Sequence, residues 1–202
     1  MIAIVDYGMG NLRSVVNAFN RLGAQVVITQ DRKTIESAHA IVLPGVGAFG
    51  KCIENLKRIK LFDFIKEIIN GDKLYLGICL GMQILFDESE EAPGIQGMGV
   101  IKGRVPRFAG NVKVPHMGWN SIEFRKKHPI FDGIPEGAHF YFVHSFYCQP
   151  KEEGVVATET SYGIPFVSSV HKGNVFACQF HPEKSQKIGL KLLENFIRLS
   201  NR

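Results

Sequence analysis

The sequence lacks any hydrophobic run long enough to cross a bilayer. Its longest apolar stretches, such as residues 41–43, fall far short of the roughly 20 apolar residues that a membrane-spanning helix needs. The N-terminal residues also lack the basic segment of a secretory signal, and Asp6 interrupts the apolar stretch too early for one. We therefore expect a cytoplasmic protein without a membrane segment.

Cysteine is scarce as well, and no two cysteines are separated by only two residues. The four cysteines are Cys52, Cys79, Cys148 and Cys178. Their wide spacing argues against a zinc ribbon and against a thioredoxin-type redox pair. Without a secretory signal, all four thiols are expected to stay reduced. We expect neither a metal nor a cofactor.

Charge of one sign is nowhere concentrated. The chain carries 24 Lys and Arg against 19 Asp and Glu, a net charge of +5, yet its densest basic cluster, residues 125–127, is only three residues long. Because nucleic-acid-binding proteins gather basic residues on one face or stripe, this distribution argues against a nucleic-acid partner. A mean hydropathy of +0.02 and the lack of long polar tracts exclude a disordered chain.

The first half of the chain alternates short apolar runs with helical patterns. Strands are predicted over residues 2–5, 25–29, 39–43 and 74–78, and helices over residues 12–22, with Asn11 as the N-cap, and, in two pieces, over residues 51–70. Such a βαβ series implies a parallel sheet that is covered by helices.

The second half is richer in strands. They are expected over residues 100–108, 119–124, 139–143, 155–160, 164–170 and 174–180, with a hairpin turn at 171–174 and a final helix over 184–199. The 202 residues thus predict a single domain, 1–202, of the α/β class. We expect a three-layer sandwich with a central, mostly parallel sheet and a partly antiparallel second half.

The most specific local pattern surrounds Cys79. A buried strand ends at this cysteine and a helical pattern begins at once, with Gly77 and Gly81 two residues away on either side. This pattern is typical of a nucleophile elbow, in which only glycine fits beside the tight turn. The N-terminus of the following helix adds partial positive charge, which stabilises an anion. The alternative is an inert buried cysteine at a glycine-containing strand end.

A cysteine nucleophile needs a base, and one of the seven histidines is well placed to act as one. His181 follows an expected strand, Pro182 stiffens the turn, and Glu183 can fold back onto the imidazole. Catalytic groups in α/β sheets gather beyond the carboxyl ends of the strands, where Cys79 and His181 are both expected. Taken alone, residues 181–183 could equally be an ordinary turn at the end of a strand.

A glycine-rich turn, residues 44–50, follows the third expected strand. Gly45, Gly47 and Gly50 fit the spacing of a dinucleotide-binding fingerprint. We reject that interpretation, because the fingerprint needs an acid at the end of the next strand, where Cys79 stands instead. Beside a thiolate, such a turn can direct backbone N–H groups at a developing oxyanion.

Together these segments resemble class I (triad) glutamine amidotransferases. The resemblance rests on residues 77–83, 181–183 and 44–47, and it implies a class I glutamine amidotransferase-like, flavodoxin-like fold. Further segments resemble more specifically the glutaminase subunit of imidazole glycerol phosphate synthase, from histidine biosynthesis. These segments are residues 6–14, 115–120, 141–145 and 181–185, so the resemblance covers nearly the whole chain.

The resemblance implies that Cys79 attacks the side-chain amide of glutamine, that His181 moves the protons, and that Glu183 orients the imidazole. Glutamate and ammonia are then released through a cysteine thioester. The implied oxyanion and glutamine-binding residues are Gly45, Val46, Gly47, Leu80, Gln83, Glu91, His144 and Ser145. Of these, Glu91 suits the α-ammonium group of a free amino acid, although it also lies in an acidic run that solvent could simply surround.

Ammonia released into water is lost to protonation, so a partner is expected to dock over Cys79. The resemblance implies the cyclase subunit, a (β/α)₈ barrel, in a heterodimer that forms imidazole glycerol phosphate and aminoimidazole carboxamide ribonucleotide. The residues that match this contact are Asn11, Trp119, Tyr141 and Lys184. Trp119, the only tryptophan, could otherwise be a core residue.

Val46 departs from the two adjacent glycines that many relatives carry at this turn. Turning its N–H inward needs a peptide flip that a β-branched residue resists. We therefore predict that the isolated subunit is a poor glutaminase and that its partner activates it.

Three other functions fit parts of the sequence. A thiol hydrolase that works without a partner, such as a cysteine peptidase, would use the same nucleophile and base. A binding module that merely keeps the fold is disfavoured by the intact set of Cys79, His181 and Glu183. Sister amidotransferases for anthranilate, guanylate or pyridoxal phosphate synthesis are disfavoured by residues 6–11 and 115–120.

Overall fold

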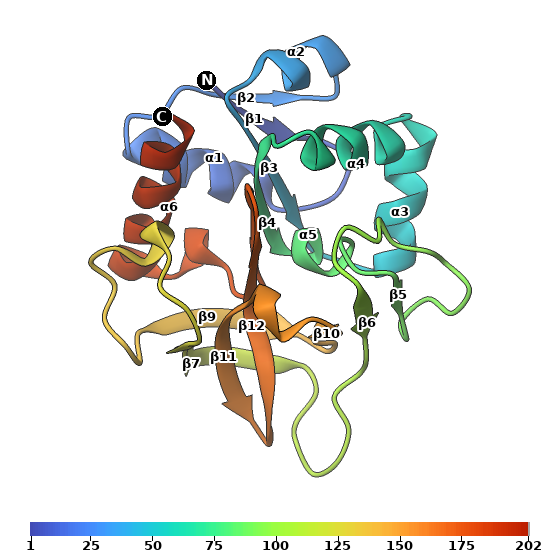
Figure 1. Ribbon diagram of the computed structural model, residues 1–202, viewed down its shortest axis with the longest axis vertical. Helices are drawn as coiled ribbons and strands as arrows, with labels where there is room; N and C mark the ends of the chain where they lie inside the picture. Colours follow the sequence, from blue (N-terminus) through green and yellow to red (C-terminus); the bar gives the residue numbers. More distant parts are fainter. Residues whose placement is uncertain (202) are drawn as a thin grey trace.

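Eight strands form the central sheet, in the order β2-β1-β3-β4-β13-β12-β11-β8 (Figure 1). The structure is a computed structural model that describes residues 1–201. Residue 202, the last of the domain expected over 1–202, lies outside the described residues. In chain order the first half contains β1 (Ile2–Val5), α1 (Leu12–Arg21), β2 (Val26–Thr29), α2 (Arg32–Ser37), β3 (Ala40–Gly45), α3 (Phe49–Arg58), α4 (Phe62–Asn70), β4 (Leu74–Cys79) and the short helix α5 (Leu80–Gln83).

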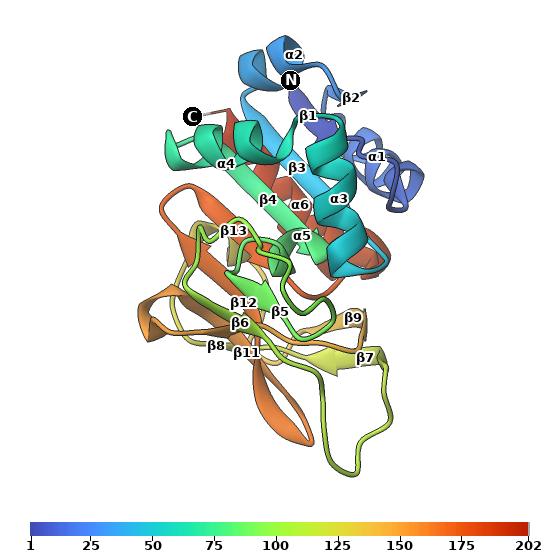
Figure 2. The ribbon, with the colours of Figure 1, turned by 90° about the vertical axis from the view of Figure 1, so that its right-hand side faces the viewer.

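The second half supplies the strand-rich lower part of the molecule in Figure 2 and one helix that lies in the upper part. It contains β5 (Glu88–Ser89), β6 (Gly103–Val105), β7 (His116–Ser121), β8 (Glu123–Phe124), β9 (His139–His144), β10 (Gln149–Pro150), β11 (Val156–Tyr162), β12 (Ile164–Lys172), β13 (Val175–Cys178) and α6 (Gln186–Ser200), with 3-10 turns at Pro129–Phe131, Glu153–Val155 and Pro182–Lys184. Outside the main sheet, β7 pairs with β9, and β10, β6 and β5 form a third sheet.

The main sheet separates two cores. Strands β2, β1, β3, β4 and β13 run parallel, and β12, β11 and β8 continue the sheet antiparallel. Along β1, Ile2 and Ile4 enter the core that α1 and α6 cover, whereas Ala3 and Val5 enter the core under α3 and α4. Figure 1 shows these helix pairs on opposite sides of the sheet. A strand that is apolar on both faces suits this position. The predicted three-layer α/β sandwich is confirmed.

The helices lie close to where the sequence predicts them. α1 is capped by Asn11, whose side chain accepts a hydrogen bond from Ser14 N at 3.3 Å. The helical stretch expected over 51–70 is divided into α3 and α4. Helix α2 is not predicted by periodicity, because Ile35 is its only buried residue and no apolar face results.

Two of the expected strands are wrong in extent. Residues 100–108 form only the three-residue β6, because Ile101 N bonds to Leu85 O and Gly103 N to the Asp87 carboxylate, rather than to a neighbouring strand. Residues 119–124 divide between β7 and β8, because the chain passes from one sheet to another at the buried Ile122. The β propensity of a segment does not specify which sheet it joins.

The remaining long strands follow the prediction, except that the strand expected over 174–180 covers only Val175–Cys178. β12 and β13 form the expected hairpin, with a turn at Gly173 and Asn174 and Gly173 at φ +58°. β13 pairs in parallel with β4, so the carboxyl ends of these two strands lie side by side although they are about 100 residues apart in the sequence. Within residues 1–201, none of the helices combines the length and the apolar composition that a bilayer crossing requires.

Candidate active site

Cys79 lies at the junction of β4 and α5, on a strained turn. Its backbone adopts φ 54° and ψ −105°, a conformation that costs a non-glycine residue about 1–3 kcal/mol. Neither flanking glycine could carry a side chain. A Cβ on Gly81 would lie 1.9 Å from the carbonyl oxygen of Leu43, and a Cβ on Gly77 would lie 2.5 Å from the carbonyl oxygen of Gly81. The close approach of β3, β4 and α5 therefore imposes the turn that presents the cysteine.

Two buried tyrosines hold backbone carbonyl groups near this turn, one carbonyl in α5 and one in the adjacent strand β3. Tyr75 Oη donates to the carbonyl oxygen of Gly81 at 2.8 Å, and Tyr7 Oη donates to that of Pro44 at 3.0 Å. Burial raises the pKa of both hydroxyls well above the ordinary value for tyrosine, so both remain donors. No local pattern identifies them in the sequence, because only the fold brings each hydroxyl to a carbonyl of another segment.

His181 and Glu183 form a buried pair beside Cys79. β13 is the neighbour of β4, with Cys178 paired with Ile78, and the chain beyond β13 brings His181 to the nucleophile. His181 Nδ1 lies 2.8 Å from Glu183 Oε1, and both side chains are 2% exposed. Burial lowers the pKa of His181, but the adjacent Cys79 and the hydrogen-bonded carboxylate of Glu183 outweigh it and raise this pKa to about 10. Nε2 is buried and has no hydrogen-bond partner within residues 1–201.

A cavity of about 420 Å³ opens beside Cys79. Seven of the eight expected oxyanion and glutamine-binding residues line it, namely Val46, Gly47, Leu80, Gln83, Glu91, His144 and Ser145. The eighth, Gly45, is paired with Cys79 between β3 and β4. Within residues 1–201, no three His, Cys, Asp or Glu side chains are grouped so that they could hold a metal ion.

The turn at residues 45–47 is tightly packed. A Cβ on Gly45 would lie 2.6 Å from Tyr7 Oη, and Gly47 adopts φ +110°. Glu91 Oε2 accepts a hydrogen bond at 2.7 Å from Phe49 N, at the start of α3. One carboxylate oxygen of Glu91 therefore anchors the helix that follows this turn, and the residue also lines the cavity.

Two of the expected glutamine-binding side chains are already hydrogen-bonded inside the protein. Gln83 Nε2 donates to Phe146 O at 3.2 Å and to Gln179 Oε1 at 3.0 Å, which uses both of its N–H bonds. His144 Nδ1 lies 2.7 Å from Phe146 O, and its Nε2 lies 2.9 Å from His116 Nδ1. A ligand in the cavity can therefore reach Gln83 through Oε1, whereas both ring nitrogens of His144 are occupied.

Gln179 and His116 also lie in this region, and the sequence patterns assign neither of them a catalytic or binding role. Gln179 Nε2 lies 3.5 Å from Cys79 Sγ, although 100 residues separate them in the chain. Its place two residues before His181, in the segment that leads from β13 to the expected base, is the one signal that could have found it. His116 lies in residues 115–120, one of the segments that carry the resemblance, but nothing in that segment reveals its contact with His144 on a different strand.

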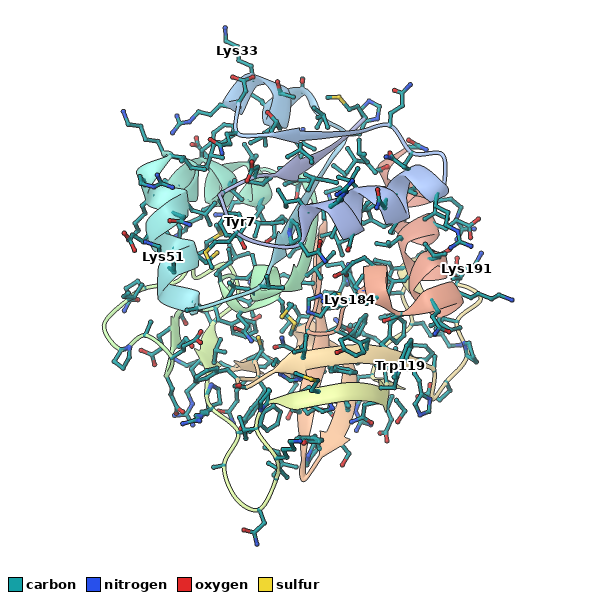
Figure 3. The ribbon with its side chains drawn as sticks, turned by 180° about the vertical axis from the view of Figure 1, so that it is seen from behind. Tyr7, Lys33, Lys51, Trp119, Lys184 and Lys191 are labelled. Atoms are coloured by element: carbon teal, nitrogen blue, oxygen red, sulfur yellow. The ribbon has the colours of Figure 1, made fainter. Side chains whose placement is uncertain are left out.

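Trp119, Tyr141 and Lys184 form a cluster that borders the cavity. Trp119 on β7 is 47% exposed, which excludes a core position, and its ring meets that of Tyr141 on β9 edge-on at 6.1 Å. Lys184, which lines the cavity, places Nζ 5.8 Å from the centre of the Tyr141 ring. Figure 3 shows Trp119 and Lys184 on one face of the molecule. Asn11, the fourth expected contact residue, is exposed at the start of α1.

The fold and the strained cysteine beside a histidine–glutamate pair define a class of protein, the class I glutamine amidotransferases. A family model described as "Glutamine amidotransferase class-I" matches residues 3–199, and the chain belongs to this family.

Within that class, the chain is similar along almost its whole length to curated proteins named "Imidazole glycerol phosphate synthase subunit HisH". The relative from Methanocaldococcus jannaschii is 51% identical, over 98% of this chain and 100% of its own length. The relative from Aquifex aeolicus is 50% identical, over 96% of this chain and 95% of its own length. The relative from Geobacter metallireducens is 49% identical, over 96% of both.

Solved structures share the fold at lower sequence identity. A chain described as "Crystal structure of glutamine amidotransferase" has a TM-score of 0.78 at 22% identity and covers 100% of both chains. A second, "Structure of PurLQS from Thermotoga maritima", has a TM-score of 0.76 at 21% identity and covers 98% of this chain and 97% of its own. At this identity the likeness supports the fold alone.

Proposed function

We propose that this chain is the glutamine-hydrolysing subunit of imidazole glycerol phosphate synthase and that it passes ammonia to the cyclase subunit. The observation that carries the proposal is the meeting of Cys79 with the paired His181 and Glu183 at the adjacent ends of β4 and β13. The similarity to HisH proteins over almost the full chain supplies the particular pathway, histidine biosynthesis.

The reaction begins when Cys79 Sγ attacks the side-chain amide carbon of glutamine. His181 receives the thiol proton and hands a proton to the leaving ammonia. Glu183 holds Nδ1 of His181, which leaves Nε2 as the nitrogen that exchanges protons with the sulfur. Water then hydrolyses the γ-glutamyl thioester to glutamate. Backbone N–H groups of Leu80 and of the 45–47 turn stabilise the oxyanion, at about 3 kcal/mol per donor.

Glutamine occupies the cavity beside Cys79. The free oxygen of Glu91 binds the α-ammonium group, because its other oxygen is held by the start of α3. Gln83 offers Oε1, because both of its N–H bonds are donated to the protein. His144 and Ser145 contribute through the wall that they form, since the His144 ring is hydrogen-bonded elsewhere.

The cyclase subunit docks over the mouth of this cavity as a (β/α)₈ barrel, in a cytoplasmic heterodimer. The exposed Trp119, with Tyr141 and Lys184 beside it, forms the main contact, together with Asn11. Ammonia that passes directly into the cyclase escapes protonation and serves to form imidazole glycerol phosphate and aminoimidazole carboxamide ribonucleotide. Because Val46 resists the peptide flip that would complete the oxyanion site, the isolated subunit turns over slowly and the partner activates it.

A diazo-ketone analogue of glutamine tests the proposal. Mapping of the adduct should place it on Cys79, and the cyclase subunit should accelerate labelling. Cys79→Ser should abolish labelling, whereas the control Cys52→Ala should keep it, because Cys52 is buried away from the cavity. Labelling of another residue, or none in the presence of cyclase, contradicts the proposal. Equal turnover of the free subunit and the liganded complex would instead favour a thiol hydrolase that works alone.

A further inference from the structure

A chain of hydrogen bonds leads from β7 toward the nucleophile. Asn120 Nδ2 donates to Ser161 O at 2.9 Å and lies 3.3 Å from His116 Nε2. His116 Nδ1 lies 2.9 Å from His144 Nε2, and His144 Nδ1 lies 2.7 Å from Phe146 O. Both imidazoles are buried, at 3% and 6% exposure, so the contact between the two rings is shielded from water.

The carbonyl oxygen of Phe146 sets the direction of every bond in this chain. A carbonyl oxygen only accepts, so His144 Nδ1 carries a proton. Burial lowers the pKa of His144 to about 3 and that of His116 to about 4, so near pH 7 each ring is neutral and carries one proton. The bare Nε2 of His144 must then accept from His116 Nδ1, and the bare Nε2 of His116 accepts from Asn120 Nδ2.

The same carbonyl oxygen orients two glutamine side chains. Gln83 Nε2 donates one hydrogen to Phe146 O at 3.2 Å and the other to Gln179 Oε1 at 3.0 Å. Because Oε1 of Gln179 is occupied in this way, Gln179 presents an N–H to Cys79 Sγ at 3.5 Å. Reversing the Gln179 amide would set two donors against each other at Gln83 and an oxygen against the sulfur.

Gln179 acts on the nucleophile and not on the ligand. It is 0% exposed and is not among the residues that line the cavity. A donor held at the sulfur stabilises an anionic cysteine and keeps it in place before the attack.

On the basis of the proposed function, we propose that Gln179 is a positioning residue of the glutaminase reaction, and that Gln83, His144 and His116 hold its N–H toward Cys79. A hydrogen bond to a charged group contributes enough to change a rate about 10- to 100-fold. Gln179 therefore governs the reactivity of the sulfur, while the affinity for glutamine is set by the cavity wall.

Gln179→Leu tests this role in the complex with the cyclase subunit, because it keeps most of the volume and removes the N–H. We expect kcat to fall about 10- to 100-fold and KM for glutamine to change by less than about twofold. Alkylation of Cys79 by iodoacetamide at pH 7, followed by peptide mapping, should slow by the same factor as kcat. Gln179→Glu should be slower still, because it places an oxygen against the sulfur.

Asn195→Leu is the matched control, since it removes a buried amide that donates to Ile130 O and Asp132 O beside α6, away from the cavity. It should lower stability without changing kcat or alkylation. A measurement that needs no variant is the ¹⁵N spectrum of the histidines, in which His116 and His144 should both be protonated at Nδ1 and bare at Nε2.

Three results would overturn the inference: a raised KM at unchanged kcat in Gln179→Leu, unchanged alkylation of Cys79 in that variant, or Nε2-protonated imidazoles in the native protein. If the native complex does not hydrolyse glutamine, the proposed function itself fails. If the native complex is active and Gln179→Leu matches it, only the role of Gln179 fails.

Discussion

Replacing Gly81 by alanine should both destabilise the fold and disable the nucleophile. The new Cβ would lie 1.9 Å from the carbonyl oxygen of Leu43 and 3.1 Å from its carbonyl carbon, where real Cβ atoms stay at least 3.0 Å away. Leu43 belongs to β3, which is held between β1 and β4, so the atom that would have to move is buried backbone. No side chain can yield in its place.

The magnitude follows from this displacement. Overpacking costs about 1–3 kcal/mol when side chains can adjust, and we expect the upper end, about 3 kcal/mol, because backbone must shift. In a domain of this size, such a loss lowers Tm by about 6–12 °C. A shift of about 1 Å at the turn also misplaces Cys79, which costs about 100-fold in kcat.

Thermal and urea denaturation of the subunit and the glutaminase rate of its complex measure the two effects. Gly154→Ala is the matched control, because nothing lies within 4 Å of its added Cβ and its φ is ordinary. It should leave kcat unchanged and stabilise by about 0.4–1 kcal/mol, through the unfolded state. If Gly81→Ala behaves like Gly154→Ala, close backbone packing does not hold the cysteine. A lowered Tm with native kcat would refute only the link to Cys79.

Tyr75→Phe removes the hydroxyl that donates to Gly81 O and should lower the free energy of unfolding by about 1–2 kcal/mol. An unchanged urea midpoint and m-value would show that this hydroxyl does not stabilise the turn. Burial lowers the pKa of His144 to about 3 in the folded chain, whereas in the unfolded chain it is about 6.5. Below pH 6.5 the unfolded chain therefore binds a proton that the folded chain does not bind. As the pH falls toward the folded pKa, the free energy of unfolding decreases by up to about 1.4 kcal/mol per pH unit. His144→Gln should reduce this slope in urea titrations between pH 6.5 and 4.5, whereas the part due to His116 and His128, whose pKa values burial also lowers, should remain. An unchanged slope would exclude His144 as a source. Trp119→Ala should weaken binding of the cyclase subunit at least about tenfold in calorimetric titration. The control Ile28→Ala, on the exposed edge strand β2, should leave the affinity unchanged. Native affinity in Trp119→Ala would place the interface elsewhere.

Much of the fold could be predicted because its signals are local. The strands of the parallel sheet are short apolar runs, and the helices between them carry one apolar face and a cap such as Asn11. Predictions failed where a segment depends on its partners. Residues 119–124 divide at Ile122 between two sheets, and α2 has a single buried residue, so neither leaves a periodic pattern.

The candidate site divides in the same way. Cys79, His181 and Glu183 are marked in the sequence by the glycines, the proline and the short spacing that a tight turn demands of its own residues. The occupied ring of His144 and the amide orientation of Gln179 are not marked, because they depend on atoms of β7, β9 and the chain after β13 that meet only in the folded protein.

The sequence by itself determined which residues can do chemistry here, since strained turns restrict the residues that form them. Only the tertiary structure decided how those residues are held. It determines which nitrogen of each histidine carries the proton, whether the N–H or the oxygen of the Gln179 amide faces the sulfur, and whether Trp119 is exposed. Hydrogen bonds and packing between distant segments carry this information, and no single segment contains it.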